Sequence, residues 1–322
     1  MYLPEKIAAL VATICLLPSL IVAEPIMKDA TISDHGRVIF DYNYQGTSEL
    51  YIIDFGLKRM EKLPTGFKRS GYPSWSPDGT TIAFSSDNSG DIELYSASSD
   101  GTGIQRLTFS NGRDISPDWS PDGRKIVFAS ERDKGRNIYV VNADGSKPVA
   151  ITDSKRKNSS PQWSPRADAI IYATDSYWPG LDIMLHTVSD DSKRILSHGF
   201  GSYSDPTWSY LATHIIFSFG TGKEKDLYML EKGGTKPVRI TGEIGSEQQP
   251  VFADKDRLIF YIGEGPEEGT GTALYCLDRS GDTIVLIATG PGNIRHPDWS
   301  PFPALPRSTN AAIRGVEDIK KK

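Results

Sequence analysis

The sequence predicts an all-β protein, a six-bladed β-propeller of four-stranded blades, because two landmarks repeat along the chain with the same spacing. The first landmark is a tryptophan, replaced once by phenylalanine, found at Trp75, Trp119, Trp163, Trp208, Phe252 and Trp299. The second is a tyrosine after an apolar residue, replaced once by methionine, found at Tyr51, Tyr95, Tyr139, Met184, Tyr228 and Tyr275. Successive copies of both landmarks are 44, 44, 45, 44 and 47 residues apart, so both follow one repeat.

Each repeat reads as four short strands joined by turns. Between Ile115 and Thr152 the apolar pieces are "ISPDWS", "KIVFAS", "NIYVVN" and "PVAIT", rich in Val, Ile, Phe, Tyr and Thr. The intervening Ser-Pro-Asp-Gly suits a type I turn, because proline presets φ at the second position and glycine closes the turn. A four-stranded unit of this length, repeated around a closed ring, is typical of a β-propeller. We expect the repeated Trp and Tyr side chains to pack in its core.

One repeat is divided between the two ends of the chain. The stretch "DHGRVIFDYN" (Asp34 to Asn43) matches the second strand of other repeats, whereas "RHPDWSP" (Arg295 to Pro301) matches only the first strand. We therefore expect the C-terminal strand to pair with the N-terminal strands, which closes the ring without an open sheet edge. The propeller is predicted over 34–303, after a lead at 24–33 and before a flexible tail at 304–322.

The first 23 residues have the pattern of a secretory signal peptide. A charged Lys6 precedes an uncharged run from Ile7 to Ala23, which ends in a small residue. Cleavage there would start the mature chain near Glu24, place it in the periplasm and leave nothing to insert into a membrane. The alternative is an uncleaved anchor, since the 17 uncharged residues approach the length that spans a bilayer.

Charge and cysteine content exclude several classes of function. The chain has 322 residues with 41 acidic and 36 basic side chains, a net charge of −5, which argues against a nucleic-acid partner. Cys276 is the one cysteine left after signal cleavage, so no internal disulfide and no cysteine-based metal site is expected. The histidines lack metal-ligand spacing. We therefore expect no metal and no cofactor. We also expect the protein to be a monomer.

The repeat also predicts where a ligand could bind. In all six units the residue three before the Trp or Phe is followed by proline. A backbone that is fixed in this way and carries varied side chains suits a binding rim at the mouth of the channel, where each innermost strand would begin. The alternative is that these residues are only solvated strand starts. The predicted channel-mouth residues are Tyr72, Ser116, Ser160, Asp205, Gln249 and His296.

A second candidate surface lies in the loop "DSYWPGLD" (Asp175 to Asp182). Trp178 is the one tryptophan outside the repeat register, and it follows Tyr177. Aromatic residues in loops are enriched at interaction surfaces, so Tyr177 and Trp178 are predicted to contact a partner. The alternative is that they fold back onto their own blade.

The stretches "PSWSPDGTTIAFSS" and "PDWSPDGRKIVFASERDKGRNIYVVNADGSKPVAIT" resemble the WD-like propeller repeats of the TolB family. The resemblance covers Asp34 to Pro301. This range corresponds to the propeller of that family, without the α/β domain that precedes the propeller there. It implies an adaptor of the Tol-Pal system of the cell envelope, which binds envelope proteins such as the peptidoglycan-associated lipoprotein. It also implies a channel that accepts an extended peptide.

No catalytic motif accompanies these repeats. The sequence has no G-x-S-x-G nucleophile turn and no complete phosphate-binding loop. We therefore predict a protein- or peptide-binding module with no catalytic residues. The alternative is an enzyme that acts on a carbohydrate or a peptide at the channel mouth, with Asp205, Gln249 and His296 as the residues to test. Asp205 and His296 would lie two blades apart, which favours recognition over acid-base chemistry.

Overall fold

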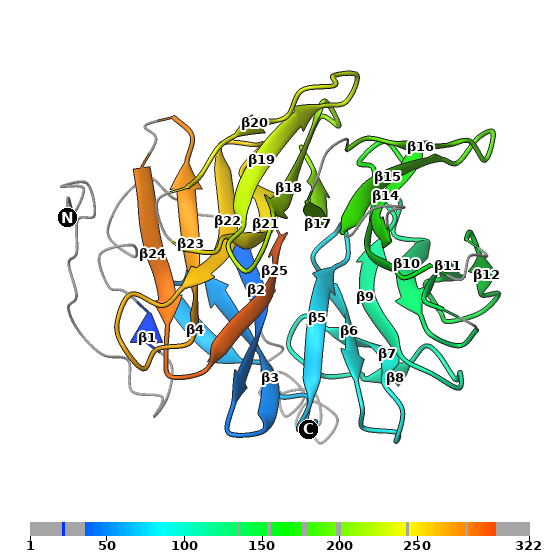
Figure 1. Ribbon diagram of the computed structural model, residues 1–322. Helices are drawn as coiled ribbons and strands as arrows, with labels where there is room; N and C mark the ends of the chain where they lie inside the picture. Colours follow the sequence, from blue (N-terminus) through cyan, green and yellow to red (C-terminus); the bar gives the residue numbers. More distant parts are fainter. Residues whose placement is uncertain are drawn as a thin grey trace, which may run out of the picture.

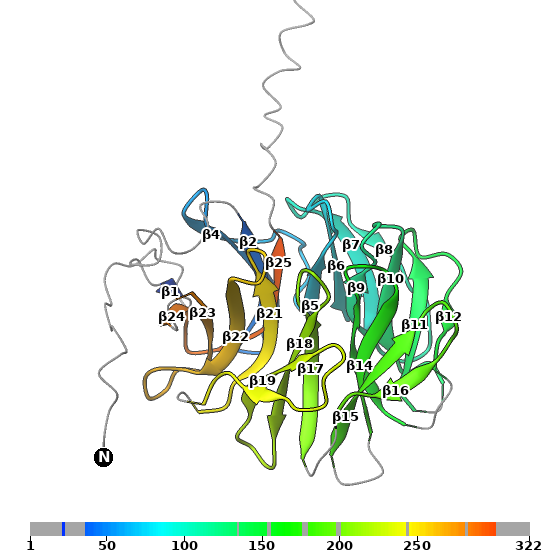
Figure 2. The same cartoon turned by 90° about the horizontal axis from the view of Figure 1, so that it is seen from above.

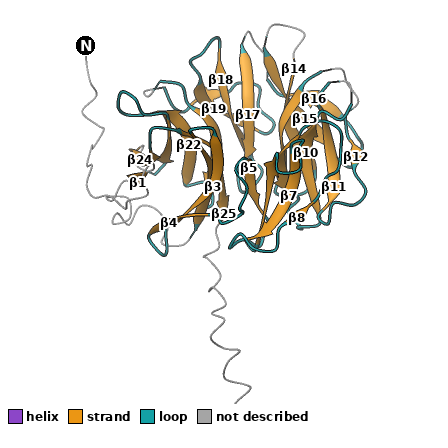
Figure 3. Cartoon of the chain, turned by 90° about the horizontal axis from the view of Figure 1, so that it is seen from below, coloured by secondary structure: helices purple, strands orange, loops and turns teal. Residues whose placement is uncertain are grey.

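The computed structural model describes residues 21–22, 36–133, 135–152, 156–175, 180–197, 201–242, 245–280 and 283–300. Within these ranges the chain forms strands and loops but no helix (Figures 1 and 3). None of the described segments is therefore a helix that could cross a membrane. Most of the predicted signal segment, the whole predicted lead and the whole predicted tail lie outside the described residues.

Six separate sheets make up the described chain, and in five of them the four strands of the blade come from one continuous stretch of sequence. In one of these five sheets the short strand β1 (Ile21–Val22) adds a fifth, outermost strand. From the axis outward, these five blades consist of β5 (Ser70–Trp75), β6 (Thr81–Ser86), β7 (Glu93–Ser98) and β8 (Gln105–Arg106); β9 (Asp114–Trp119), β10 (Lys125–Ser130), β11 (Asn137–Asn142) and β12 (Val149–Ala150); β13 (Asn158–Trp163), β14 (Ala169–Asp175), β15 (Leu181–Thr187) and β16 (Lys193–Ile195); β17 (Ser202–Trp208), β18 (His214–Gly220), β19 (Asp226–Glu231) and β20 (Val238–Arg239); and β21 (Gln248–Ala253), β22 (Leu258–Glu264), β23 (Thr272–Asp278) and β24 (Thr283–Thr289).

The sixth blade joins the two ends of the propeller, as the split repeat predicts. Its strand order is β25 (Asn293–Ser300), β2 (Arg37–Tyr44), β3 (Thr47–Asp54) and β4 (Arg59–Lys62). Strands β25 and β2 pair antiparallel, with Val38 opposite Trp299. The prediction of a six-bladed propeller closed by the C-terminal strand is therefore confirmed.

The blades form a closed ring around one axis (Figure 2). Each innermost strand contacts the innermost strand of the next blade, in the order β25, β5, β9, β13, β17, β21 and back to β25. The six innermost strands therefore surround a central channel, and their side chains determine what that channel can bind.

The turn between the first two strands of a blade has the predicted geometry. In the second blade along the chain, the Gly79 backbone N–H donates to the Ser76 carbonyl at 2.8 Å, and Gly79 has a φ of +67°. The Ser76 hydroxyl donates to the Asp78 carboxylate at 2.6 Å and accepts from the Thr81 backbone N–H at 2.9 Å. Ser-Pro-Asp-Gly therefore starts the hairpin with backbone and side-chain hydrogen bonds.

The two repeated aromatic landmarks lie in the core between blades. Trp75 packs with Ile39 and Ile52 of the preceding blade, and Trp208 packs with Ile171 of its own preceding blade. Tyr95 is 4% exposed and stacks on Phe84 with 5.9 Å between ring centroids. A buried aromatic side chain removes about 150–250 Å² from water, so one per blade stabilises each interface between neighbouring sheets.

One short strand lies near the start of the chain. Ile21–Val22 forms a short strand, β1, that pairs antiparallel with residues 288–289 of β24. Both residues of β1 belong to the predicted signal segment.

Cys276 is 2% exposed, and burial raises the pKa of its thiol, as expected for an unreactive core cysteine.

Candidate functional site

Each innermost strand contains an irregularity at the same place. The six predicted channel-mouth residues all have left-handed backbone conformations, with φ between 48° and 55°. In every blade, the pairing register with the second strand shifts at this residue and the proline after it. These positions are therefore β-bulges, which re-aim side chains at the rims of sheets and next to binding sites.

The recurring proline fits the bulge for a physical reason. A bulged residue leaves the ladder of backbone hydrogen bonds, so the missing N–H of proline costs no pairing there. A left-handed conformation is unfavourable for residues other than glycine, and strain of this kind is kept where the surrounding structure fixes it. The prediction that these residues begin the innermost strands is wrong. Tyr72 and His296, for example, lie inside β5 and β25.

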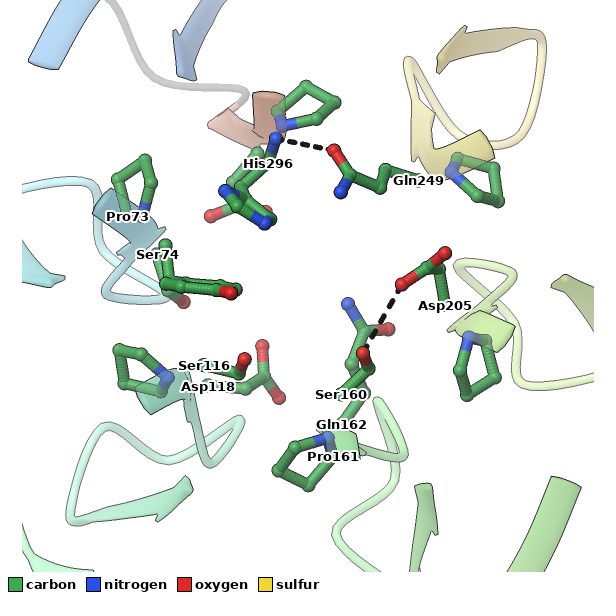
Figure 4. Close-up of a pocket in the computed structure, with 16 residues that line it drawn as sticks. Pro73, Ser74, Ser116, Asp118, Ser160, Pro161, Gln162, Asp205, Gln249 and His296 are labelled. Atoms are coloured by element: carbon green, nitrogen blue, oxygen red, sulfur yellow. Dashed lines mark hydrogen bonds between the residues drawn. The ribbon is translucent and has the colours of Figure 1, made fainter. Parts of the chain in front are cut away.

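The bulges direct all six side chains to one cavity at the channel axis (Figure 4). The cavity has a volume of about 100 Å³, which is room for a small polar group or a single side chain. The structure therefore brings together every predicted channel-mouth residue. Their binding role stays a prediction. The cavity is lined by Tyr72, Ser116, Ser160, Asp205, Gln249 and His296, by the six prolines that follow them, and by Ser74, Asp118, Gln162 and Asp298.

Hydrogen bonds between blades hold part of this ring in place. The Gln249 side-chain oxygen accepts from the His296 backbone N–H at 2.7 Å, and the Ser160 hydroxyl donates to Asp205 at 3.3 Å (Figure 4). The Asp205 carboxylate also accepts from the Ser204 hydroxyl at 3.0 Å. Gln249 therefore has its oxygen engaged in positioning His296, whereas Asp205 keeps a carboxylate at the cavity wall.

His296 has a buried partner that sequence reasoning missed. Its Nδ1 lies 2.5 Å from Oδ1 of Asp41, a residue of β2 whose side chain is fully buried. The other oxygen of Asp41 accepts two hydrogen bonds from the Arg295 guanidinium, at 2.9 and 3.1 Å. Burial raises the pKa of Asp41, but the neighbouring His296 and Arg295 outweigh it, so the net effect is a lowered pKa. Asp41 is therefore an ionised acceptor.

The hydrogen bonds of Asp41 determine which nitrogen of His296 carries a proton. An ionised carboxylate can only accept, so Nδ1 of His296 must be the donor. Whenever the ring is neutral, Nε2 is therefore the unprotonated nitrogen and can accept a hydrogen bond. The Tyr72 ring lies against the imidazole, with 3.7 Å between ring centroids, and the Tyr72 backbone N–H also donates to Asp41 at 3.3 Å. The His296 ring is therefore fixed in both orientation and tautomer.

A second layer of polar side chains lies two residues further along the innermost strands. Oδ2 of Asp298 accepts from the Trp75 backbone N–H at 2.6 Å, and Oδ2 of Asp118 accepts from the Trp163 backbone N–H at 2.7 Å. Burial raises the pKa of Asp298 to about 6 and that of Asp118 well above its usual value. Each backbone hydrogen bond opposes the effect of burial on its own carboxyl. These residues join neighbouring blades and line the same cavity.

The other predicted surface cannot be placed. Tyr177 and Trp178 lie outside the described residues, so their predicted contact with a partner remains an expectation from the sequence. Within the described ranges, no group of three or more His, Cys, Asp and Glu side chains is arranged to hold a metal ion.

The family model of the TolB beta propeller domain matches residues 30–113 and 94–256. The chain belongs to the TolB β-propeller family. The resemblance inferred from the sequence is thus confirmed. A search of curated proteins found no significant match.

Solved structures support the fold at low sequence identity. TolB from Acinetobacter baumannii is 20% identical with a TM-score of 0.69, over 83% of this chain and 67% of that chain. A putative TolB from Agrobacterium tumefaciens is 16% identical with a TM-score of 0.62, over 80% and 91% of the two chains. A puromycin-hydrolyzing peptidase from Mycobacterium tuberculosis is 14% identical with a TM-score of 0.54, over 77% and 44%. Likeness at these identities shows the propeller fold alone.

Proposed function

We propose that this TolB-like propeller is a binding module of the cell envelope that captures a protein through an extended segment inserted into the channel. The observation that carries the proposal is the ring of six bulges, whose strained backbone directs six side chains of five residue types into one cavity. Strain maintained at six equivalent positions is more readily explained by recognition than by packing. Varied polar side chains on a fixed frame provide specificity.

The proposed location and partner come from family membership and from the sequence. A signal segment would deliver the protein to the periplasm, where it would act as a monomer without a cofactor. The proposed partner is an envelope protein, in the first instance the peptidoglycan-associated lipoprotein of the Tol-Pal system. A cavity of about 100 Å³ admits a side chain but no folded domain, so the partner would enter as an extended segment.

Calorimetric titration of the protein with the peptidoglycan-associated lipoprotein of the same organism tests this proposal. We expect binding at micromolar or tighter affinity, and loss of that binding in Ser116→Arg, because the long side chain fills the cavity. Val149→Arg is the matched control, since Val149 is 60% exposed on the outer strand β12. Absence of heat would remove the lipoprotein as a partner. Equal affinity in both variants would place binding outside the channel.

A second candidate function is favoured by the contact between Asp41 and His296. A histidine whose Nδ1 is held by a buried carboxylate has the arrangement of a general base. The corresponding activity would be hydrolysis or elimination on a carbohydrate or a peptide at the channel mouth. The test is whether the protein turns over envelope polysaccharides or peptides. If it does, and if His296→Phe loses this turnover while it keeps the fold, the enzyme is supported over the binding module. The absence of turnover would leave recognition as the role of this pair.

A further inference from the structure

The His296 imidazole has one nitrogen engaged and one nitrogen available. Nδ1 is bound to Asp41, while none of the described residues forms a hydrogen bond with Nε2. The side chain is 17% exposed, and it lines the channel cavity. An imidazole that is fixed by a carboxylate at Nδ1 and open at Nε2 is prepared to accept a hydrogen bond from something that enters the cavity.

The charges around the cavity indicate what that entering group should be. Asp118, Asp205 and Asp298 all line the cavity, and none forms an ion pair with a described residue. The Arg295 guanidinium is already engaged by Asp41. The Lys225 ammonium donates to the Ser204 hydroxyl, which in turn donates to Asp205. A buried or half-buried carboxylate is stabilised by an opposite charge within about 4–6 Å. A cationic hydrogen-bond donor would therefore satisfy the carboxylates and Nε2 together.

We propose that the channel recognises the ammonium group of a lysine side chain carried by an extended segment, and that Nε2 of His296 accepts one of its hydrogen bonds. This inference rests on the proposed peptide-binding function and names the chemical group that the cavity takes. In it, Asp41 is a positioning residue, because it fixes the tautomer that makes Nε2 an acceptor. Ammonium fits better than the larger planar guanidinium, since the cavity is small and its acceptors converge from several blades.

Two blocked pentapeptides test the inference. Gly-Gly-Lys-Gly-Gly and the same peptide with norleucine have nearly the same shape and differ in the ammonium group. By calorimetry at pH 7.5, we expect the lysine peptide to bind at least tenfold more tightly, the effect of one hydrogen bond to a charged donor. His296→Phe keeps a ring against Tyr72 but removes the acceptor, so it should abolish the preference. Equal affinity of the two peptides, or no binding of the lysine peptide, would overturn the inference.

The tautomer provides a readout that a purely structural role would not change. In Asp41→Asn the amide oxygen should face Arg295, which can only donate, so the amide NH₂ would face His296 and donate to Nδ1. Nε2 would then carry the proton and repel a donor. Nitrogen NMR of the imidazole, assigned with His296→Phe, should show that the proton has moved from Nδ1 to Nε2. Calorimetry of Asp41→Asn should show at least tenfold weaker binding of the lysine peptide. A changed tautomer with unchanged affinity would contradict the role of Nε2.

These outcomes are separable from those of the proposed function. Lipoprotein binding that is blocked by Ser116→Arg, combined with equal affinity for the two pentapeptides, would leave the binding module in place and remove the ammonium site. Lysine-specific binding without lipoprotein binding would keep the site and reject that partner.

Discussion

The His296 imidazole and the Asp41 carboxylate are joined by a 2.5 Å hydrogen bond although 255 residues separate them in the chain. The contact exists because His296 lies on β25 and Asp41 lies on β2, the two strands whose pairing closes the ring. The orientation of the His296 side chain in the cavity therefore depends on ring closure. Any change that loosens the closing blade should disturb the cavity at the same time.

Asp41→Asn should destabilise the propeller by about 3 kcal/mol, because it removes the negative partner of Arg295 at a buried position. Urea unfolding at pH 7 measures this difference. Glu61→Gln is the matched control, since Glu61 forms an ion pair with Arg59 at the surface and should contribute less than about 1 kcal/mol. If the two variants lose the same stability, the buried pair has no special role in closure.

Asp41 also predicts a dependence on acid. Its pKa in the folded state is lowered by His296 and Arg295 in spite of burial, so the carboxylate stabilises the fold above the unfolded pKa of about 4. That stability is lost as the pH falls through the folded pKa. The free energy of unfolding of the wild type should therefore drop more between pH 5 and pH 2 than that of Asp41→Asn. Parallel pH profiles would show that another group governs acid unfolding.

The period of the repeat was sufficient to predict the fold and the ring of cavity residues, because every blade repeats the same landmarks at the same spacing. Asp41 was missed because its role depends on the register between strands from opposite ends of the chain. A signal was nevertheless present, since Asp41 is the one charged residue at its place in the repeat. The residues that occupy the same place in the other blades are Ser85, Ala129, Ala173, Ser218 and Ile262.

The left-handed bulges predict effects of different size for one substitution at neighbouring positions. Ser160 has a φ of 48°, whereas Ser159 beside it in β13 has an ordinary strand conformation. Ser160→Val should cost about 1–2 kcal/mol more than Ser159→Val, because a β-branched side chain is strained in the left-handed region. Ser160→Gly should maintain stability, since glycine adopts this φ freely. Equal urea midpoints for the two valine variants would show that the bulge carries no strain.

Asp298→Asn should stabilise the protein in base and not in acid. Burial raises the folded pKa of Asp298 to about 6, so its ionisation opposes folding as the pH rises from about 4, the unfolded value, through 6. Asparagine keeps an oxygen for the Trp75 N–H and should gain about 1–2 kcal/mol at pH 8, with no gain at pH 4. Asp91→Asn, at an exposed position, controls for net charge. A gain that is the same at both pH values would assign the effect to packing instead of ionisation.

Gly36→Ala should open the closing blade. Gly36 has a φ of +140°, and an added Cβ would lie 2.2 Å from the ring of Trp299 on β25. That ring cannot retreat, because it packs on Phe55 and Phe260 with centroids 6.1 and 5.6 Å away. Crowding and backbone strain together should cost about 2–4 kcal/mol.

Gly46→Ala separates the two causes, since Gly46 also has a positive φ, +82°, but no atom lies within 4 Å of its added Cβ. It should cost about 1 kcal/mol in a urea titration, from backbone strain alone. Because His296 shares β25 with Trp299, Gly36→Ala should also shift the imidazole resonances of His296, whereas Gly46→Ala should not. A destabilised Gly36→Ala whose His296 resonances remain in place would show that the cavity does not depend on the closing blade.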